Sequence, residues 1–262
     1  FGIPVRFSGI NQYFTDCGRE STNVGIELLE RQGGYIYLPE FQPGSEYAPT
    51  SSQLNFFGAP VPYWYYLSGN NIVKEQAPTK SKMEEQLARF IEEDLGRCSL
   101  ASFVESGFTV DVGKADVSVS IGSESVSVNL QNPISASFGD EKVLLDNFKF
   151  SVDSKLGAIY DTALRIYHYE KTNSFLENYG VDVLRLYAPV DGVEISCAPK
   201  VWKFSDVKNE LVSALEANTQ ALKVQGKYYK INEKRREYFV VKGLSSDYQV
   251  NFIYSGSFPF KV

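Results

Sequence analysis

The strongest constraint on the fold is a stretch in which apolar and polar residues alternate, DVSVSIGSESVSVNL, at residues 116–130. On both sides of a short break, valine, isoleucine or leucine occupies every second position, and serine occupies most of the others. Because successive side chains of a strand point to opposite faces of a sheet, this pattern predicts strands with one buried and one solvated face. The break is Gly122-Ser123-Glu124, so we predict an antiparallel hairpin that turns there.

Four other stretches show the 3.6-residue apolar period of amphipathic helices. They cover residues 10–31, 81–95, 154–169 and 206–224. Gly33 and Gly34 follow the first stretch, and glycine readily adopts the left-handed conformation that ends a helix. We expect the second helix to begin with a capping box formed by Ser81 and Glu84. The third is expected to bury Ile159 on its inward face.

The remaining strand signals complete the fold prediction. They lie near residues 147–153, 181–188, 192–198, 227–231, 237–243 and 248–255. Two rounds of strands followed by a helix predict an α+β fold with mainly antiparallel sheets and three or four helices. We place an N-terminal α+β lobe at residues 1–180 and a C-terminal α+β lobe at residues 181–262. The last strand pattern breaks off at Val262, so we expect the second lobe to be truncated and the natural chain to continue.

Residues 35–78 are rich in proline, glycine, serine, asparagine and aromatic residues, which predicts a long irregular arm with short strands, one of them at residues 35–39. Four consecutive aromatic residues lie in this arm: Tyr63, Trp64, Tyr65 and Tyr66. In an extended chain the first and third rings point to one side, and the second and fourth to the other. Two interpretations stay open: the rings pack the arm onto its own domain, or they form an exposed platform that binds a glycan or a protein.

The chain offers few side chains for catalysis or metal binding. It has one histidine, His168, and three cysteines, none of them in the C-x-x-C spacing of a zinc site. We therefore expect no catalytic residues, no metal and no cofactor. The net charge of −6 gives no general attraction for nucleic acid, and a basic run at residues 223–236 is interrupted by glutamate and is interpreted as a solvated turn.

Three blocks of sequence occur in an order that resembles a known group of proteins. They are a cysteine-bearing helix leading into QGGYI (Cys17 to Ile36), the segment PYWYY with a polar turn (Pro62 to Asn71), and the helix EEQLxxFIExxLxxC that ends at Cys98. The blocks are similar to those of archaeal membrane-anchored surface proteins of uncharacterised function. In that group a long ectodomain follows one N-terminal hydrophobic segment. This chain begins at Phe1 and contains no such segment, so we expect the anchor to lie ahead of Phe1.

The resemblance also implies a role for the cysteines. Cys17 and Cys98 would form a disulfide between the first two helices, on the extracellular face of the cell membrane. Such a bridge would close a loop of about eighty residues and stabilise the fold by roughly 4 kcal/mol in the chain-entropy model. Cys197 would then pair with a residue after Val262 or remain free and buried.

The function that we expect is that of a non-enzymatic cell-surface ectodomain for binding, adhesion or assembly. Its partner would be a protein, a cell-envelope component or a second copy of the chain, and not a nucleic acid. Two alternatives stay open. A carbohydrate-binding module or glycan-active enzyme would use Trp64, Tyr65 and Tyr66 as a stacking platform. A viral or filament structural subunit would assemble with copies of itself.

Overall fold

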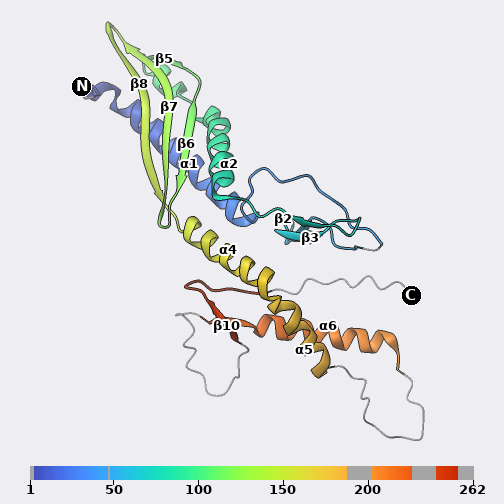
Figure 1. Ribbon diagram of the computed structural model, residues 1–262. Helices are drawn as coiled ribbons and strands as arrows, with labels where there is room; N and C mark the ends of the chain where they lie inside the picture. Colours follow the sequence, from blue (N-terminus) through green and yellow to red (C-terminus); the bar gives the residue numbers. More distant parts are fainter. Residues whose placement is uncertain (1–2, 47, 188–201, 226–239, 253–262) are drawn as a thin grey trace, which may run out of the picture. The chain divides into compact units, whose positions relative to one another are not determined.

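The computed structural model describes residues 3–46, 48–187, 202–225 and 240–252 (Figure 1). The fold is α+β, as the sequence predicts. The chain divides into two compact units, Phe1–Tyr160 and Asp161–Val262, and each is described by itself. The boundary expected near residue 180 falls inside a helix of the second unit.

The centre of the first unit is a four-stranded antiparallel sheet. Its strands are β5 (Thr109–Val112), β6 (Asp116–Ile121), β7 (Ser125–Phe138) and β8 (Glu141–Asp153). β7 is central: β8 pairs with one of its edges along nearly its whole length, while β6 and β5 pair with successive parts of the other edge. The predicted hairpin is confirmed, because Ile121 lies opposite Val126 across the Gly122-Ser123-Glu124 turn.

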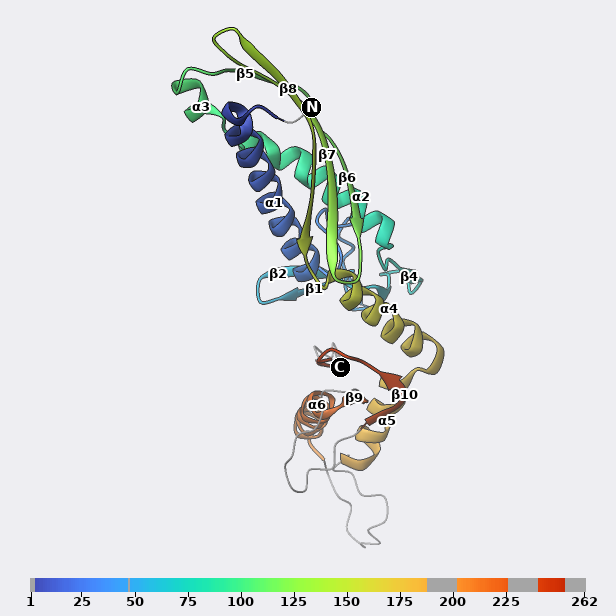
Figure 2. The same cartoon turned by 90° about the vertical axis from the view of Figure 1, so that its left-hand side faces the viewer.

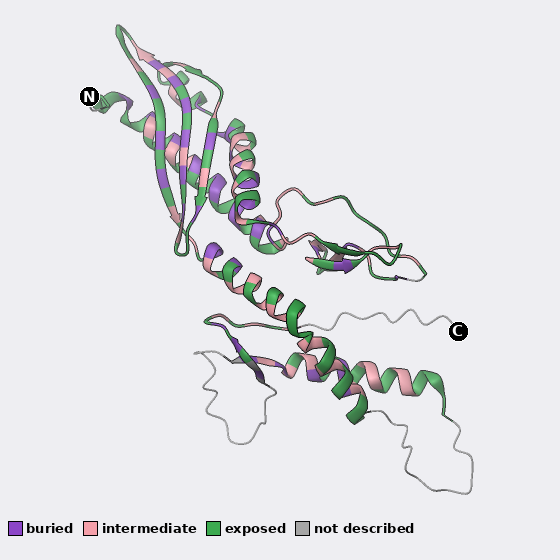
Figure 3. Ribbon diagram, viewed as in Figure 1, coloured by how far each residue is buried: buried purple, intermediate pink, exposed green. Residues whose placement is uncertain are grey.

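Two helices, α1 (Ser8–Arg31) and α2 (Lys80–Asp94), cover one face of this sheet (Figure 2). Along β6, β7 and β8 buried residues alternate with exposed ones (Figure 3), as the period-2 pattern requires. In the core, Phe14 of α1 contacts Phe148 of β8, with ring centroids 5.0 Å apart. On the other face, Ser118, Ser120, Ser127 and Ser151 are exposed, and none of the described helices lies over it.

A disulfide joins the two covering helices. Cys17 lies in α1, and Cys98 follows the short 3₁₀ helix η2 (Leu95–Arg97) that extends α2. Their Cα atoms are 6.1 Å apart, and 81 positions separate them in the sequence. The expected pairing is confirmed. Cys197 lies outside the described residues.

The start of α2 corrects the predicted capping box. Thr79 is the N-cap, and its hydroxyl accepts a hydrogen bond from the Lys82 amide at 3.1 Å. Ser81 therefore lies in the first turn. The Glu84 carboxylate does not reach back to a cap, because it accepts a hydrogen bond from the Ile121 amide of β6 at 2.9 Å. Threonine caps a helix much as serine does, and the sequence signal was displaced by two positions.

The arm is pinned to α2 where it begins. The buried amide of Gln86 accepts hydrogen bonds from the Ile36 and Tyr37 amides, at 3.1 and 3.0 Å. The strand predicted at residues 35–39 is therefore wrong, because these donors go to a side chain instead of another strand. Farther on, the arm forms two short antiparallel hairpins. Their strands are β1 (Gln53–Phe56), β2 (Ala59–Pro62), β3 (Tyr65–Leu67) and β4 (Val73–Glu75).

Three short or shared elements complete the first unit. A 3₁₀ turn, η1 (Val5–Phe7), precedes α1, and α3 (Ala101–Glu105) precedes β5. Helix α4 (Leu156–Asn173) begins in the first unit and continues into the second. Its first turn buries Leu156 and Tyr160, whereas Ile159, expected to face inward, is 42% exposed.

The second unit contains α5 (Phe175–Tyr187), α6 (Phe204–Ala221) and a parallel pair of strands, β9 (Lys223–Gln225) and β10 (Val240–Ser245). Its core gathers Leu222 and Val224 with Val241 and Leu244. The predicted helix at residues 206–224 ends early, at Ala221, because Lys223–Gln225 form β9 and pair with β10.

The strand predicted at residues 181–188 is wrong, because α5 occupies this segment up to Tyr187. Leu176, Tyr179 and Val183 recur at helical spacing, and the Tyr179 hydroxyl donates to the Asn218 carbonyl of α6 at 3.0 Å. Contact with α6 therefore selects the helix over the local alternation. The strands predicted at residues 192–198 and 227–231 lie outside the described residues, and described residues 248–252 are not strand.

Replacing Cys17 and Cys98 together by serine should lower the free energy of unfolding by roughly 4 kcal/mol, because the open chain regains the entropy of the loop between them. Urea unfolding of the variant and of the parent chain, without reductant, measures the difference. The parent chain unfolded in the presence of reductant is the matched control and should show the same loss. Equal midpoints for the double variant and the parent would contradict a stabilising bridge.

Candidate functional site

The four predicted aromatic residues differ in exposure. Tyr65 is 47% exposed, Tyr66 is 8% exposed, and Tyr63 and Trp64 are half-buried. The Trp64 indole N–H donates to the Gly33 carbonyl at 2.9 Å, so this ring is held against the end of α1. The four side chains therefore do not form one exposed surface, although they are consecutive in the sequence.

Trp64 also has a packing partner within the first unit. Its ring lies 6.1 Å from the ring of Tyr160, centroid to centroid, and the Tyr160 hydroxyl donates to the Pro78 carbonyl at 2.7 Å. These contacts connect the middle of the arm to the start of α2 and the first turn of α4. A role of the four rings in binding a ligand stays a prediction, and among them Tyr65 presents the largest exposed fraction.

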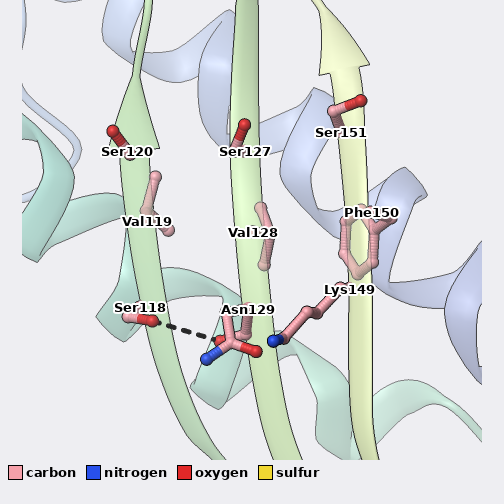
Figure 4. A pocket seen from close by; sticks show the side chains of 9 residues that line it. All are labelled: Ser118, Val119, Ser120, Ser127, Val128, Asn129, Lys149, Phe150 and Ser151. Atoms are coloured by element: carbon pink, nitrogen blue, oxygen red, sulfur yellow. Dashed lines mark hydrogen bonds between the residues drawn. The ribbon is translucent and has the colours of Figure 1, made fainter.

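A shallow groove of about 600 Å³ lies on the sheet face that the helices leave open (Figure 4). Its lining comes from β6, β7 and β8: Ser118, Val119, Ser120, Ser127, Val128, Asn129, Lys149, Phe150 and Ser151. The strand register aligns the polar members in two rows across the sheet. One row is Ser120, Ser127 and Ser151, and the other is Ser118, Asn129 and Lys149.

The chemistry of the groove is that of a hydrogen-bonding surface. Serine hydroxyls donate and accept, the Lys149 ammonium only donates, and the Asn129 amide does both. The Asn129 side-chain oxygen is buried and has no hydrogen-bond partner among the described residues. The Ser118 hydroxyl donates to the Asn129 backbone carbonyl at 3.4 Å, and Figure 4 shows the Lys149 side chain reaching toward Asn129. Such a surface can hold polar groups of a partner.

The sequence does not predict this groove as a site, although the serines that line it on β6 and β7 belong to the predicted hairpin. In the sequence, the serines of residues 118–127 indicate only the solvated half of the alternation. Lys149 and Ser151 belong to a strand that was predicted separately, and their neighbours on β7 follow from the register. Only the pairing of three strands brings the two polar rows together.

The second unit contains a perturbed carboxylate. Burial, and then a hydrogen bond with Glu177, raise the pKa of Glu170 to about 7. Its Oε2 atom also accepts a hydrogen bond from the Leu176 amide at 3.0 Å, in the first turn of α5. This contact gives Glu170 a structural role as a cap. The single histidine, His168, lies exposed on α4.

Within the described ranges, no group of three or more His, Cys, Asp or Glu side chains could hold a metal ion. None of the described helices combines the length and the apolar character that crossing a bilayer requires.

Comparison with protein-family models, with curated proteins and with solved structures finds no match to this chain. The resemblance to archaeal surface proteins therefore stays a prediction.

Replacing Trp64 by alanine should destabilise the first unit by roughly 3 kcal/mol, since it removes a half-buried ring and a hydrogen bond. Replacing Tyr65 by alanine is the matched control and should cost below about 1 kcal/mol, because this ring is largely in water. Chemical denaturation monitored by circular dichroism gives both values. Equal costs for the two variants would show that Trp64 does not anchor the arm.

The raised pKa of Glu170 predicts a pH dependence of stability. A carboxyl group whose pKa is higher in the folded state binds its proton more tightly there, so stability is highest below the ordinary pKa of glutamate and falls as pH rises toward about 7. With allowance for solvent screening we expect a loss on the order of 1 kcal/mol. The Glu170→Gln variant should lack this loss when urea unfolding is compared across that interval. Glu210→Gln, on the exposed face of α6, should keep it, and equal slopes in both variants would contradict the assignment.

Proposed function

We propose that this chain is a non-enzymatic binding or assembly module of a cell-surface protein, and that the open polar face of its sheet makes the contact. The observation that carries the proposal is the groove on that face, where two rows of hydroxyl, amide and ammonium groups lie uncovered. A sheet covered on one face only is common, but a buried amide oxygen without a partner is costly and favours an external hydrogen-bond donor.

The disulfide indicates a non-reducing environment, since such bonds persist outside the cytoplasm and are rare within it. A location at the cell surface is consistent with this environment and with the resemblance of the sequence blocks. The bridge also serves a binding role, because it ties together the two helices that support the sheet from behind. A rigid support lets the open face keep its shape when a partner binds.

Catalysis is the less well supported alternative. The serines of the groove have no histidine nearby in the first unit, since His168 lies on α4 beyond the unit boundary. A carbohydrate-binding role through the arm would depend mainly on Tyr65, because Trp64 is used in packing and Tyr66 is buried. None of the contacts among the described residues favours this role over binding at the sheet.

The test is binding of the fluorescently labelled chain to isolated envelopes of the cells that produce it. We expect saturable binding that Ser127→Arg weakens by roughly tenfold or more, because a long charged side chain would fill the centre of the groove. Ser213→Arg, on the exposed face of α6, adds the same charge elsewhere and should bind like the parent. Absence of saturable binding, or equal binding by both variants, would overturn the proposal.

A further inference from the structure

The β1–β2 hairpin of the arm ends in two exposed aromatic residues. Phe57 is 95% exposed and Phe56 is 39% exposed. Their rings lie 4.6 Å apart, centroid to centroid, so they form one apolar cluster at the hairpin tip, residues 55–60. A methyl group built at Gly58 would meet no atom of the described residues within 4 Å, apart from its chain neighbours, so this side of the turn is open. Figure 2 shows the hairpin projecting to one side of α1.

The backbone of the turn does not favour phenylalanine. Phe57 and Gly58 connect the two strands, since Phe56 pairs with Ala59. The φ angles of the two turn residues are 49° and 86°, and positive values at both positions are the requirement of a type I′ turn. Asparagine is the preferred residue at the first of these positions, whereas a bulky side chain is strained there. Packing does not offset this strain, because the Phe57 ring is almost entirely exposed, and strain of this kind concentrates at functional positions.

The outer edge of β2 carries no backbone donors. At the base of the hairpin the Tyr63 amide donates to the Ser52 carbonyl at 3.0 Å, which fixes the alternation of inward and outward N–H groups along the strand. Pro60 and Pro62 therefore occupy the positions whose N–H would point away from β1. Proline has no N–H, so this edge neither requires an acceptor from water nor completes a ladder with a further strand.

The hairpin lies in an uncharged part of the chain. Charged residues make up 22% of the sequence, but residues 47–73 contain no Asp, Glu, Lys, Arg or His. In the turn, the Gly58 amide donates to the Asn55 side-chain oxygen at 2.9 Å. Charges and backbone donors without partners are the groups that a bilayer excludes most strongly. The tip therefore combines exposed apolar area with few of the groups that oppose entry into lipid.

We propose that the hairpin tip inserts into a lipid bilayer, at the boundary between the headgroups and the acyl chains. Apolar faces that bind there enter by about 5–10 Å, which at about 3.3 Å per strand residue takes in the turn and the first two residues of each strand. Burial increases from the tip toward the base of the hairpin, where Pro62 is buried. The base therefore stays against the protein while the two rings enter the lipid.

A bilayer fits the tip better than a protein or a second copy does. Protein contacts usually surround apolar anchors with a polar rim, whereas Asn55 is the only polar side chain of residues 55–60. A second copy that paired along β2 would find no donors there, and the groove on the sheet is lined mainly by polar groups, which do not suit two phenyl rings. The lipid contact goes beyond the function proposed above, because it uses the arm and not the sheet.

Flotation of the full chain with phosphatidylcholine vesicles, at low and at high salt, tests the contact. We expect the parent to float at both salt concentrations, because no charge of the tip takes part. Phe57→Asn should lower the partition coefficient roughly tenfold or more without weakening the fold, because asparagine suits the turn. Phe41→Asn removes an exposed ring elsewhere in the arm and should float like the parent. A parent chain that does not float, that floats only at low salt, or that loses binding equally in both variants overturns the proposal.

The depth of insertion is measured with a tryptophan at the tip. On addition of vesicles, the emission of Phe57→Trp should shift to shorter wavelength, and brominated acyl chains should quench it, beyond the signal of Trp64 and Trp202 in the parent. Phe41→Trp should show neither change. Added emission from Phe57→Trp that the brominated lipid leaves unquenched overturns insertion.

The lipid contact and the proposed function can fail separately. Ser127→Arg changes the groove and should float like the parent. Envelope binding that Ser127→Arg weakens, in a chain that does not float with vesicles, would refute the lipid contact alone. Envelope binding that Phe57→Asn weakens and Ser127→Arg leaves unchanged would assign the binding to the tip and refute the role of the groove.

Discussion

The sheet of the first unit depends on the two helices behind it, and these helices are held together by one covalent bond. Neither helix contacts the whole sheet. On its buried face, α1 packs against β8 and the middle of β7, and α2 packs against β6. Gly25 of α1 allows close approach, since a methyl group there would meet the Leu87 side chain of α2 at 2.3 Å. The Cys17–Cys98 bridge ties the middle of α1 to the end of α2, so the two helices that cover the buried face are joined covalently.

The same arrangement explains why the two faces of the sheet have different chemistry. Valine, leucine and phenylalanine fill the space below the strands, and the serines above them are small enough to leave a groove. Large apolar residues on this face would have to be buried by a further layer of structure. Long charged side chains would occupy the groove. Small polar side chains leave both the backbone and the side-chain groups accessible to a partner.

Much of the fold could be predicted where the signal is local. The alternation of residues 116–130 determines a hairpin and the period of residues 10–31 determines a helix, because each needs only its own side chains. The local alternation of residues 181–188 predicts a strand, whereas contact with α6 decides that the segment is helical up to Tyr187. The pairing of Cys17 with Cys98 followed from the resemblance and not from spacing. The groove could not be predicted, because it exists only once three strands are placed in register.

The buried amide of Gln86 gives the arm a particular place in the stability of the molecule. The backbone amides of Ile36 and Tyr37, at the entry of the arm, both donate to this one side chain of α2, and the arm's own hairpins are short. Loss of α2 would therefore free the entry of the arm, whereas Trp64 keeps a separate contact with the Gly33 carbonyl after α1. Hydrogen exchange of the Ile36 and Tyr37 amides therefore reports whether α2 is folded, although these amides lie outside the helix.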